Sequence, residues 1–436
     1  MKRLYVIVAL LLPLSAFGQY YGGYLELNRP DGHYDIGDTL EVWAELNEYT
    51  DEIVEFSIHR NMNEITVRHN INVAEGRNLI YSEICKEEAH YVFIIGEPGQ
   101  KVGSEYISTV GAIVAPERFM AGYRAPKDLR KFWDKQIAKM RKLPLKASVK
   151  EIELTKKNHN GFKCFDIEIP MPEGNPVRAY LAYPENADKK SLPIVIHTHP
   201  FGVKGKACQC SVDKTIQDAK RGSGTIALDI NAHGMLNGQP QSYYDDLFEG
   251  ELKNYSKRQY SSHKDFYFRL MYLRLVRALD YLVTLPQWDG ERVLVYGDCQ
   301  GGGEAAALCG IDSRVKAASM EVPILIDIAG SLNNRMGNGP SGHNIEENAD
   351  ILAYYDGVCL LTLTQAKLYF EAGLIDYTAP PGCVATGYYN AASGDKTIVY
   401  SPYRPHNAAH ADNRFIEKWR QEVKAPREKW INDYLK

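Results

Sequence analysis

The sequence predicts an α/β protein with a doubly wound, mostly parallel sheet, preceded by a small all-β domain. After about residue 145, short apolar runs such as LPIVIHTHP and RVLVYG alternate with segments of helical periodicity, as expected of parallel strands covered by helices on both faces. Before about residue 115, short alternating or β-branched runs recur at roughly ten-residue spacing with turn residues between them, which is typical of a β-sandwich. We therefore expect an Ig-like sandwich over 19–120 and an α/β domain over 121–436.

The elements of the second domain follow in order. The segment 121–144 predicts an amphipathic helix, because its apolar residues recur three to five positions apart. A strand at 192–200, a helix near 210–221, a strand at 224–234 and a long helix at 265–286 come next. Other runs predict strands: VKEIELT, GFKCFDIEIPM and VRAYLAYPE before residue 192, and RVLVYG, RVKAASMEVP, AKLYFEAGLIDYTAPP and KTIVYSPY after residue 290.

Two inserts, 235–263 and 327–357, are long enough to be either lids or ordinary exposed loops. Four tyrosines in them are candidates to line a pocket: Tyr243, Tyr244, Tyr354 and Tyr355.

The N-terminus carries the pattern of an export signal. Two basic residues precede an apolar stretch that ends at Leu14, and small residues follow, so we expect a signal peptide over 1–18, cleaved after Gly18. A membrane anchor is the alternative, but the stretch is shorter than the roughly 20 residues that a bilayer crossing requires. The expected protein is secreted or periplasmic, with no membrane span.

Charge and cysteine content narrow the class further. Lys and Arg number 51 against 55 Asp and Glu, a formal net charge of −4, so we expect no nucleic-acid partner. Eight cysteines in an exported chain invite disulfides, but they form no repeating framework, and their pairing stays open.

The stretch VLVYGDCQGGGEAAA (293–307) carries the candidate chemistry. A β-branched run ends in Gly297, Cys299 follows, and three glycines beginning at Gly301 open an alanine-rich helix. This is the nucleophile elbow of an α/β-hydrolase, G-x-S-x-G, with cysteine in place of serine. The amide of Gln300 would point to where an oxyanion forms. The alternative is a buried cysteine in an incidental turn.

A nucleophile needs a base and an acid, which in this fold class follow it in the order acid, then histidine. Asp376, in GLIDYTAPP, and His406, in YSPYRPHNAAH, each come just after an apolar strand. His410 is the competing base. A second oxyanion donor should follow the strand at 192–200, and Phe201 is the candidate because Pro200 has no amide hydrogen.

The stretch HTHPFGVKGKACQC also permits a metal site built from His197, His199, Cys208 and Cys210. The C-x-C pair lacks the usual spacing of structural zinc sites. The two histidines also lie on the predicted strand that leads into the loop with Phe201, the candidate oxyanion donor. We therefore expect no metal and no cofactor.

From about residue 125 onward the chain resembles the acetyl xylan esterase / cephalosporin C deacetylase family of α/β-hydrolases (carbohydrate esterase family seven). The similar stretches include DLRKFWDKQIAKMRKLP, LPIVIHTHPFG, VLVYGDCQGGGEAAALCGIDSRVKAASMEVP and GLIDYTAPPGCVATGYYN. Where the family has Gly-x-Ser-Gln-Gly-Gly, this chain has Cys299. The resemblance also implies Asp376 as the acid, His406 as the base, and the Phe201 and Gln300 amides as the oxyanion hole.

The chain departs from the family pattern at four points. Ala232-His233-Gly234 stands in place of Arg-Gly-Gln, Asn407 follows His406 in place of Glu, and Cys299 replaces serine. The β-rich N-terminal domain is not part of the family's minimal form.

The sequence thus predicts an exported carboxylic-ester hydrolase that deacetylates acetylated xylan or a related small acylated saccharide through a Cys-His-Asp triad. A cysteine is a competent nucleophile when the pKa of its thiol is lowered. Dienelactone hydrolases, which have a similar fold, carry a cysteine as the nucleophile at this elbow. A catalytically degenerate glycan-binding protein and a prolyl-oligopeptidase-like peptidase or lactone hydrolase remain as alternatives. Members of the resembled family often form ring-shaped oligomers, so whether this chain forms a homo-oligomer is an open question. The added N-terminal domain is the feature that would block such an assembly.

Overall fold

The computed structural model describes residues 23–46, 52–73, 76–96, 108–258, 260–339, 344–408 and 413–436. The expected signal peptide and the competing base His410 lie outside the described residues.

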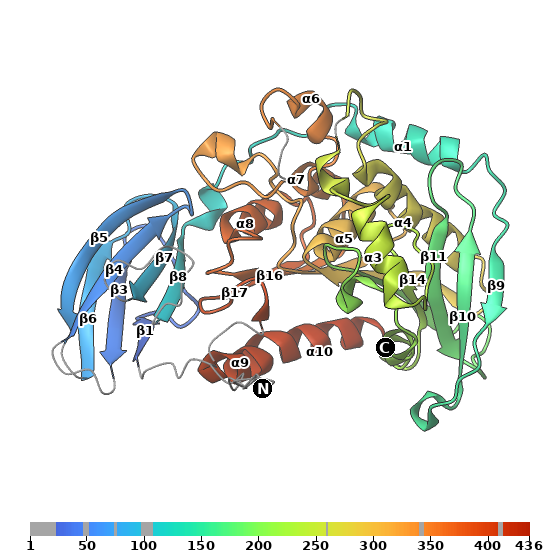
Figure 1. The fold of residues 1–436 in the computed structure, drawn as a ribbon, viewed down its shortest axis with the longest axis horizontal. Helices are drawn as coiled ribbons and strands as arrows, with labels where there is room; N and C mark the ends of the chain where they lie inside the picture. Colours follow the sequence, from blue (N-terminus) through green and yellow to red (C-terminus); the bar gives the residue numbers. More distant parts are fainter. Residues whose placement is uncertain are drawn as a thin grey trace, which may run out of the picture.

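The first domain consists of two packed sheets and is drawn in blue in Figure 1. One has the strand order β1-β3-β6 and the other β2-β8-β7-β4-β5. On β3, Leu40, Val42 and Ala44 are buried, the period of two expected of a strand with one face in a core. The bounds are β1 (Gly23–Leu27), β2 (His33–Tyr34), β3 (Thr39–Leu46), β4 (Glu52–Arg60), β5 (Glu64–Val73), β6 (Gly76–Ile84), β7 (Ala89–Gly96) and β8 (Ser108–Val114).

The second domain is built on a nine-stranded sheet with the order β17-β16-β15-β14-β12-β13-β11-β10-β9. The six strands from β17 to β13 are parallel, and β11, β10 and β9 continue the sheet antiparallel. The bounds are β9 (Ser148–Glu151), β10 (Phe162–Ile169), β11 (Val177–Pro184), β12 (Leu192–Thr198), β13 (Ile226–Ile230), β14 (Trp288–Asp298), β15 (Ala317–Glu321), β16 (Lys367–Gly373) and β17 (Lys396–Ser401).

Helices cover both faces of this sheet. On β12, Ile194 and Ile196 pack into the cluster that contains α1, α4 and α5, whereas Val195 packs into the opposite cluster with α2 and α10. Because both faces of the sheet are buried at β12, the sequence of this strand is a continuous apolar run. The bounds are α1 (Leu129–Met140), α2 (Val212–Ala219), α3 (Gln241–Glu249), α4 (Phe268–Leu282), α5 (Gln300–Ile311), α6 (Ala349–Leu352), α7 (Gly357–Leu360), α8 (Pro381–Asn390), α9 (Asn413–Trp419) and α10 (Ala425–Tyr434).

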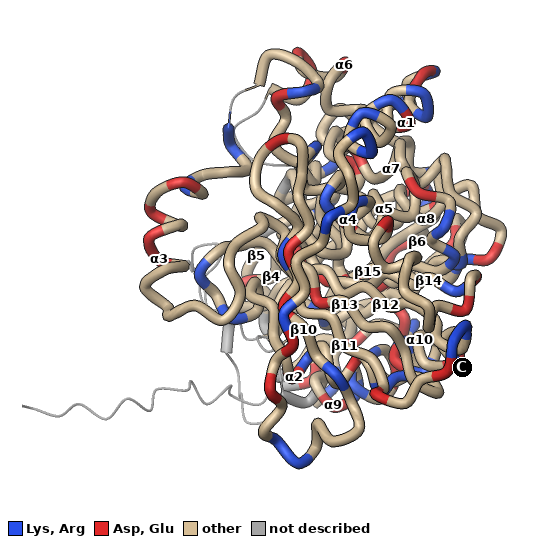
Figure 2. The backbone as a smooth tube through the Cα atoms, turned by 90° about the vertical axis from the view of Figure 1, so that its right-hand side faces the viewer, with Lys and Arg blue, Asp and Glu red and all other residues tan. Residues whose placement is uncertain are grey.

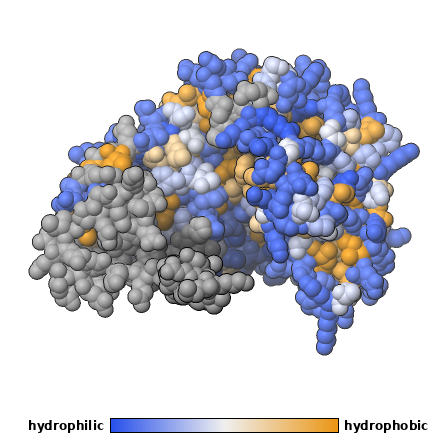
Figure 3. Space-filling view, in the orientation of Figure 1, coloured by the Kyte–Doolittle hydropathy of each residue, from blue (hydrophilic) through white to orange (hydrophobic). Residues whose placement is uncertain are grey.

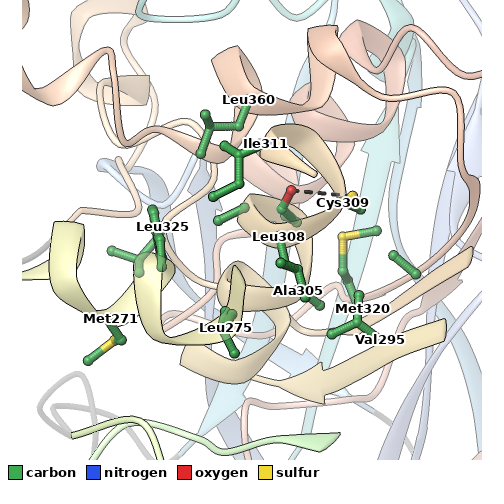
Figure 4. Close-up of a cluster of buried hydrophobic side chains, with 14 of the residues drawn as sticks. Met271, Leu275, Val295, Ala305, Leu308, Cys309, Ile311, Met320, Leu325 and Leu360 are labelled. Carbon is green, nitrogen blue, oxygen red and sulfur yellow. Dashed lines mark hydrogen bonds between the residues drawn. The ribbon is translucent and has the colours of Figure 1, made fainter. Parts of the chain in front are cut away.

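Helix α5 is buried along its whole length. Figure 4 shows Leu308 of α5 among apolar side chains of the neighbouring elements, including Leu275 of α4, Val295 of β14 and Met320 of β15. The thiol of Cys309 donates to the Ala306 carbonyl at 3.3 Å, so this cysteine is a packed core residue. The predicted α/β architecture with a preceding β-domain is confirmed.

The surface agrees with the balanced composition. Basic and acidic residues are interspersed along the chain (Figure 2), and the described part of the face in Figure 3 is mostly hydrophilic with scattered apolar residues. Among the helices that the structure describes, none is both long and apolar enough to cross a membrane.

The two domains meet beside the loop after β16. The His90 ring, fully buried, contacts the Leu374 carbonyl through Nε2 at 2.7 Å, and the Gly111 amide donates to the Pro402 carbonyl at 2.9 Å. A Cβ on Gly111 would lie 2.1 Å from the Leu374 carbonyl oxygen, so only glycine permits this approach. The first domain therefore contacts the chain two residues before Asp376.

His90 makes the stability of this interface sensitive to acid. Burial lowers its pKa to about 4, despite the opposing hydrogen bond to Leu374. Between pH 6.5 and 4 the unfolded chain binds the proton and the folded chain does not, so stability falls as the pH falls. We expect a loss of about 3 kcal/mol from this residue across that window, measured by urea unfolding at a series of pH values.

The variant His90→Gln should flatten that slope, whereas His69→Gln, at an exposed position, should leave it unchanged. Part of the slope should persist, because burial also lowers the pKa of His233, to about 3. An identical slope in wild type and His90→Gln would contradict the prediction.

Candidate active site

Cys299 occupies the single position between β14, which ends at Asp298, and α5, which begins at Gln300. Its backbone has φ 55° and ψ −121°, a conformation that costs a non-glycine residue on the order of 1–3 kcal/mol. The Cys299 amide donates to the Glu321 carbonyl and the Ile324 amide donates to the Cys299 carbonyl, both at 3.0 Å. These bonds hold the sharp bend that a nucleophile elbow requires.

The glycines on either side of Cys299 are required by the end of β12. A Cβ on Gly297 would lie 2.3 Å from Thr198 Oγ1, and a Cβ on Gly301 would lie 2.4 Å from the Thr198 carbonyl oxygen. The Thr198 hydroxyl itself donates to the Gly301 carbonyl at 2.8 Å. The G-x-C-x-G spacing is therefore set by the close approach of this neighbouring strand.

Asp376 and His406 follow β16 and β17, which are adjacent parallel strands. His406 Nδ1 lies 2.8 Å from Asp376 Oδ2, and Asp376 Oδ1 accepts hydrogen bonds from the Thr378 and Ala379 amides, both at 2.8 Å. The Cys299 side chain is hydrogen-bonded to the His406 ring, and its thiol is free. The structure thus brings together the three residues that the sequence predicts as nucleophile, base and acid.

The surroundings of His406 favour its charged form. Burial lowers the pKa of the ring, but the hydrogen bonds to Asp376 and to Cys299 outweigh burial and raise the pKa to about 10. The ring therefore holds its second proton at neutral pH.

Cys299 and His406 both line a cavity of about 670 Å³. Its walls are partly apolar, with Phe201 and Phe268, and partly polar, with Asp298. The two inserts contribute Ser256, Asn338 and Gly339 to the described lining, but none of the four tyrosines proposed from the sequence. Two of them are buried: Tyr244, and Tyr355, which lies in the core against Trp133 and Tyr272.

The amides proposed as oxyanion donors belong to Phe201, on the loop after β12, and Gln300, at the start of α5. Neither donates a hydrogen bond to any residue in the described part of the chain, and Phe201 lines the cavity with Cys299. The Phe201 N–H therefore borders the cavity without a partner in the described chain, whereas Gln300, at the positive end of the helix dipole, is fully buried.

Two residues that sequence reasoning missed support these donors. His233 Nε2 donates to the Gly202 carbonyl at 3.0 Å, and its Nδ1 lies 2.9 Å from the Tyr267 hydroxyl. The Tyr255 hydroxyl donates to Gln300 Oε1 at 2.7 Å. His233 stands where the resembled family has the middle of Arg-Gly-Gln, and that departure was the only sequence signal for its role.

A buried ion-pair network fixes the turn that leads to His406. Arg404 contacts Glu371 at 2.5 Å and Glu321 at 2.6 Å, and Arg427 of α10 contacts Glu371 at 2.7 Å. Because Glu321 ends β15 and Glu371 lies in β16, the network joins the C-terminal ends of these strands to the chain just before His406.

The sequence-proposed metal ligands separate into two groups. The Cys208 thiol donates to the Phe201 carbonyl at 3.4 Å, so this cysteine is tied to the loop that carries Phe201. His197 and His199 instead meet Asp229 of β13, at 2.7 and 2.8 Å, a residue absent from the sequence-based set.

A mostly parallel sheet with a cysteine at the sharp bend after β14 and an Asp–His pair after β16 and β17 is the arrangement of an α/β-hydrolase. The family model for acetyl xylan esterase (AXE1) matches residues 117–423, which is more than half of the chain. The protein therefore belongs to the acetyl xylan esterase family and is a carboxylic ester hydrolase, as the resemblance implied.

Individual relatives agree with this assignment. Acetyl esterase Axe7A of Xylanibacter ruminicola is 26% identical over 423 residues, 92% of this chain and 91% of that protein. An acetyl xylan esterase from Paenibacillus sp. R4 superposes with a TM-score of 0.55 at 22% identity, covering 71% of this chain and 98% of its own. Acetyl xylan esterase 1 from Thermoanaerobacterium sp. JW/SL YS485 gives 0.54 at 19% identity, covering 72% and 97%. The two structural likenesses show the fold, and the alignment with Axe7A extends into the N-terminal domain.

Proposed function

We propose that the protein removes acetyl groups from xylan-type saccharides with Cys299 as the nucleophile. The observation that carries this proposal is the contact chain from the Cys299 thiol through His406 to Asp376 at one wall of a 670 Å³ cavity. A small acylated saccharide is the substrate class that the family membership and the size of the cavity favour. The expected signal peptide supports action outside the cytoplasm.

The proposed reaction begins with the Cys299 sulfur as a thiolate beside a doubly protonated His406, whose pKa is raised. The Cys299 thiolate adds to the ester carbonyl carbon, and the Phe201 and Gln300 amides donate to the resulting oxyanion. His406 then gives its proton to the departing sugar oxygen as the carbon–oxygen bond breaks, which leaves an acyl-thioester. Neutral His406 next takes a proton from water, and the hydroxide adds to the thioester carbon. The carbon–sulfur bond then breaks, which reforms the thiolate–imidazolium pair and releases acetic acid, whose proton passes to the solvent.

Asp376 has a positioning role in this scheme. Its Oδ2 accepts the hydrogen bond from His406 Nδ1, which keeps Nε2 directed at sulfur and substrate. Amides of its own loop hold its other oxygen, so the carboxylate cannot rotate away.

Acetate release from acetylated xylan by the mature protein, measured enzymatically, tests this function. We expect turnover of acetylated xylan and of 4-nitrophenyl acetate, and complete loss of both after iodoacetamide. Hydrolysis of a proline-linked peptide anilide without ester turnover would indicate the peptidase alternative. Binding of acetylated xylan with no turnover of any ester would indicate the degenerate glycan-binding alternative.

A further inference from the structure

A second cluster of chemistry-bearing side chains lies next to the active site, at the ends of β12 and β13. His197 lies on β12 and His199 follows one residue after the end of this strand, and the two rings are neighbours with centroids 4.8 Å apart. Asp229 is the register partner of His197 on β13. Its Oδ1 lies 2.7 Å from His197 Nδ1 and 2.8 Å from His199 Nε2, and the three ligand atoms lie within 4.8 Å of one another.

The contacts around His199 direct its second ring nitrogen at the Asp229 carboxylate. Its Nδ1 lies 2.8 Å from the Ala207 carbonyl oxygen, which accepts only, so Nδ1 carries a hydrogen. Nε2 is buried and faces Asp229 Oδ1 at 2.8 Å. A zinc ion would bind both of these atoms in place of their contact with each other.

A thiol adjoins these three ligand atoms, and an outer shell orients them. The Cys210 thiol is hydrogen-bonded to the His199 ring, and the Ser211 amide donates to the second Asp229 oxygen at 2.7 Å. Metal-binding histidines and carboxylates are commonly oriented in this way, by a carbonyl or an amide on the atom that does not bind the metal. Two imidazoles, a carboxylate and a thiolate are a donor set that suits zinc.

We propose that His197, His199, Asp229 and Cys210 form a structural site for one zinc ion beneath the loop that carries Phe201. None of the four is among the described residues that line the active-site cavity, and four protein ligands leave no open position for substrate or water. Zinc lies about 2.0–2.2 Å from nitrogen and oxygen donors and about 2.3 Å from sulfur, so the contacts of His197 and His199 with Asp229, at 2.7 and 2.8 Å, lengthen on binding. The site would tie the oxyanion loop to the sheet.

Metal analysis of the mature protein tests this site independently of ester hydrolysis. After equilibration with zinc and dialysis into metal-free buffer, we expect about one zinc ion per chain by mass spectrometry. His199→Gln and Cys210→Ser should each retain less than a tenth of that amount, whereas Cys208→Ser, the other cysteine of the C-x-C pair, should retain it in full. Zinc should also raise the unfolding temperature of the metal-free wild type.

Cobalt(II) provides a measurement on the wild type alone, in case a variant fails to fold. We expect tetrahedral d–d absorption and a thiolate-to-cobalt charge-transfer band, both lost when zinc is added. If the wild type retains no metal and zinc leaves its unfolding temperature unchanged, a doubly protonated His199 bridging to Asp229 explains the geometry and the proposal is wrong. Equal zinc content in wild type and His199→Gln would show surface binding and would also overturn it.

Discussion

Replacing Cys299 by alanine is expected to lower kcat for 4-nitrophenyl acetate by roughly 10⁴-fold or more. The substitution removes the atom that forms the covalent intermediate and leaves only the cavity and the oxyanion donors. Residue 299 already has a φ of 55° with a cysteine side chain. Alanine keeps the same Cβ, so the substitution adds no backbone strain and the fold should persist. Steady-state kinetics measure the loss, and thermal unfolding confirms that the variant is folded.

Two companion variants separate the nucleophile from the other thiols. Cys299→Ser should retain a fraction of the activity and become resistant to iodoacetamide, since a serine at this elbow can use the same base. Cys85→Ser, in the first domain, should keep both wild-type activity and sensitivity to iodoacetamide. Undiminished turnover by Cys299→Ala would remove Cys299 from the mechanism.

The parts of the site that sequence reasoning could predict depend on local geometry. A β-branched run, a lone residue between glycines and an alanine-rich helix define an elbow within fifteen positions, and the chain order of α/β-hydrolases then leads to Asp376 and His406. The required glycines at 297 and 301 reflect a steric demand that is visible in the sequence as small residues.

The parts that sequence reasoning missed depend on which strands become neighbours. Asp229 meets His197 only because β12 and β13 pair in parallel with that register, and the sequence around Asp229 reads as an ordinary buried strand. The contact of His90 with Leu374 joins residues 284 positions apart. No periodicity within either segment indicates it.

The tyrosines of the two inserts show the opposite error. Their clustering in long loops suggested pocket walls, yet Tyr244 and Tyr355 are buried. The inserts fold back onto α1 and α4, where aromatic rings pack against one another. Loop length thus indicated that these segments approach the site, but not which side chains they present to it.

Replacing Asp376 by asparagine is expected to lower kcat by about 10⁴-fold with little change in fold. The asparagine side-chain oxygen can still accept hydrogen bonds from the Thr378 and Ala379 amides. Facing His406, its amide nitrogen donates, so the ring must turn or adopt the tautomer that presents N–H to the sulfur. Kinetics on the variant measure the loss, and Asp395→Asn, at an exposed carboxylate, provides the matched control with unchanged kcat.

The same substitution should change the pH dependence of stability. In the wild type, the pKa of His406 is raised to about 10 against a usual 6.5, so its contribution to stability is fully present below pH 6.5 and is lost as the pH rises through 10. Without the Asp376 carboxylate, burial pulls the pKa of His406 down, and the alkaline loss should shrink and move to lower pH. Urea unfolding from pH 6 to 10 measures it, and an unchanged alkaline profile in Asp376→Asn would show that the carboxylate does not hold the proton on the ring.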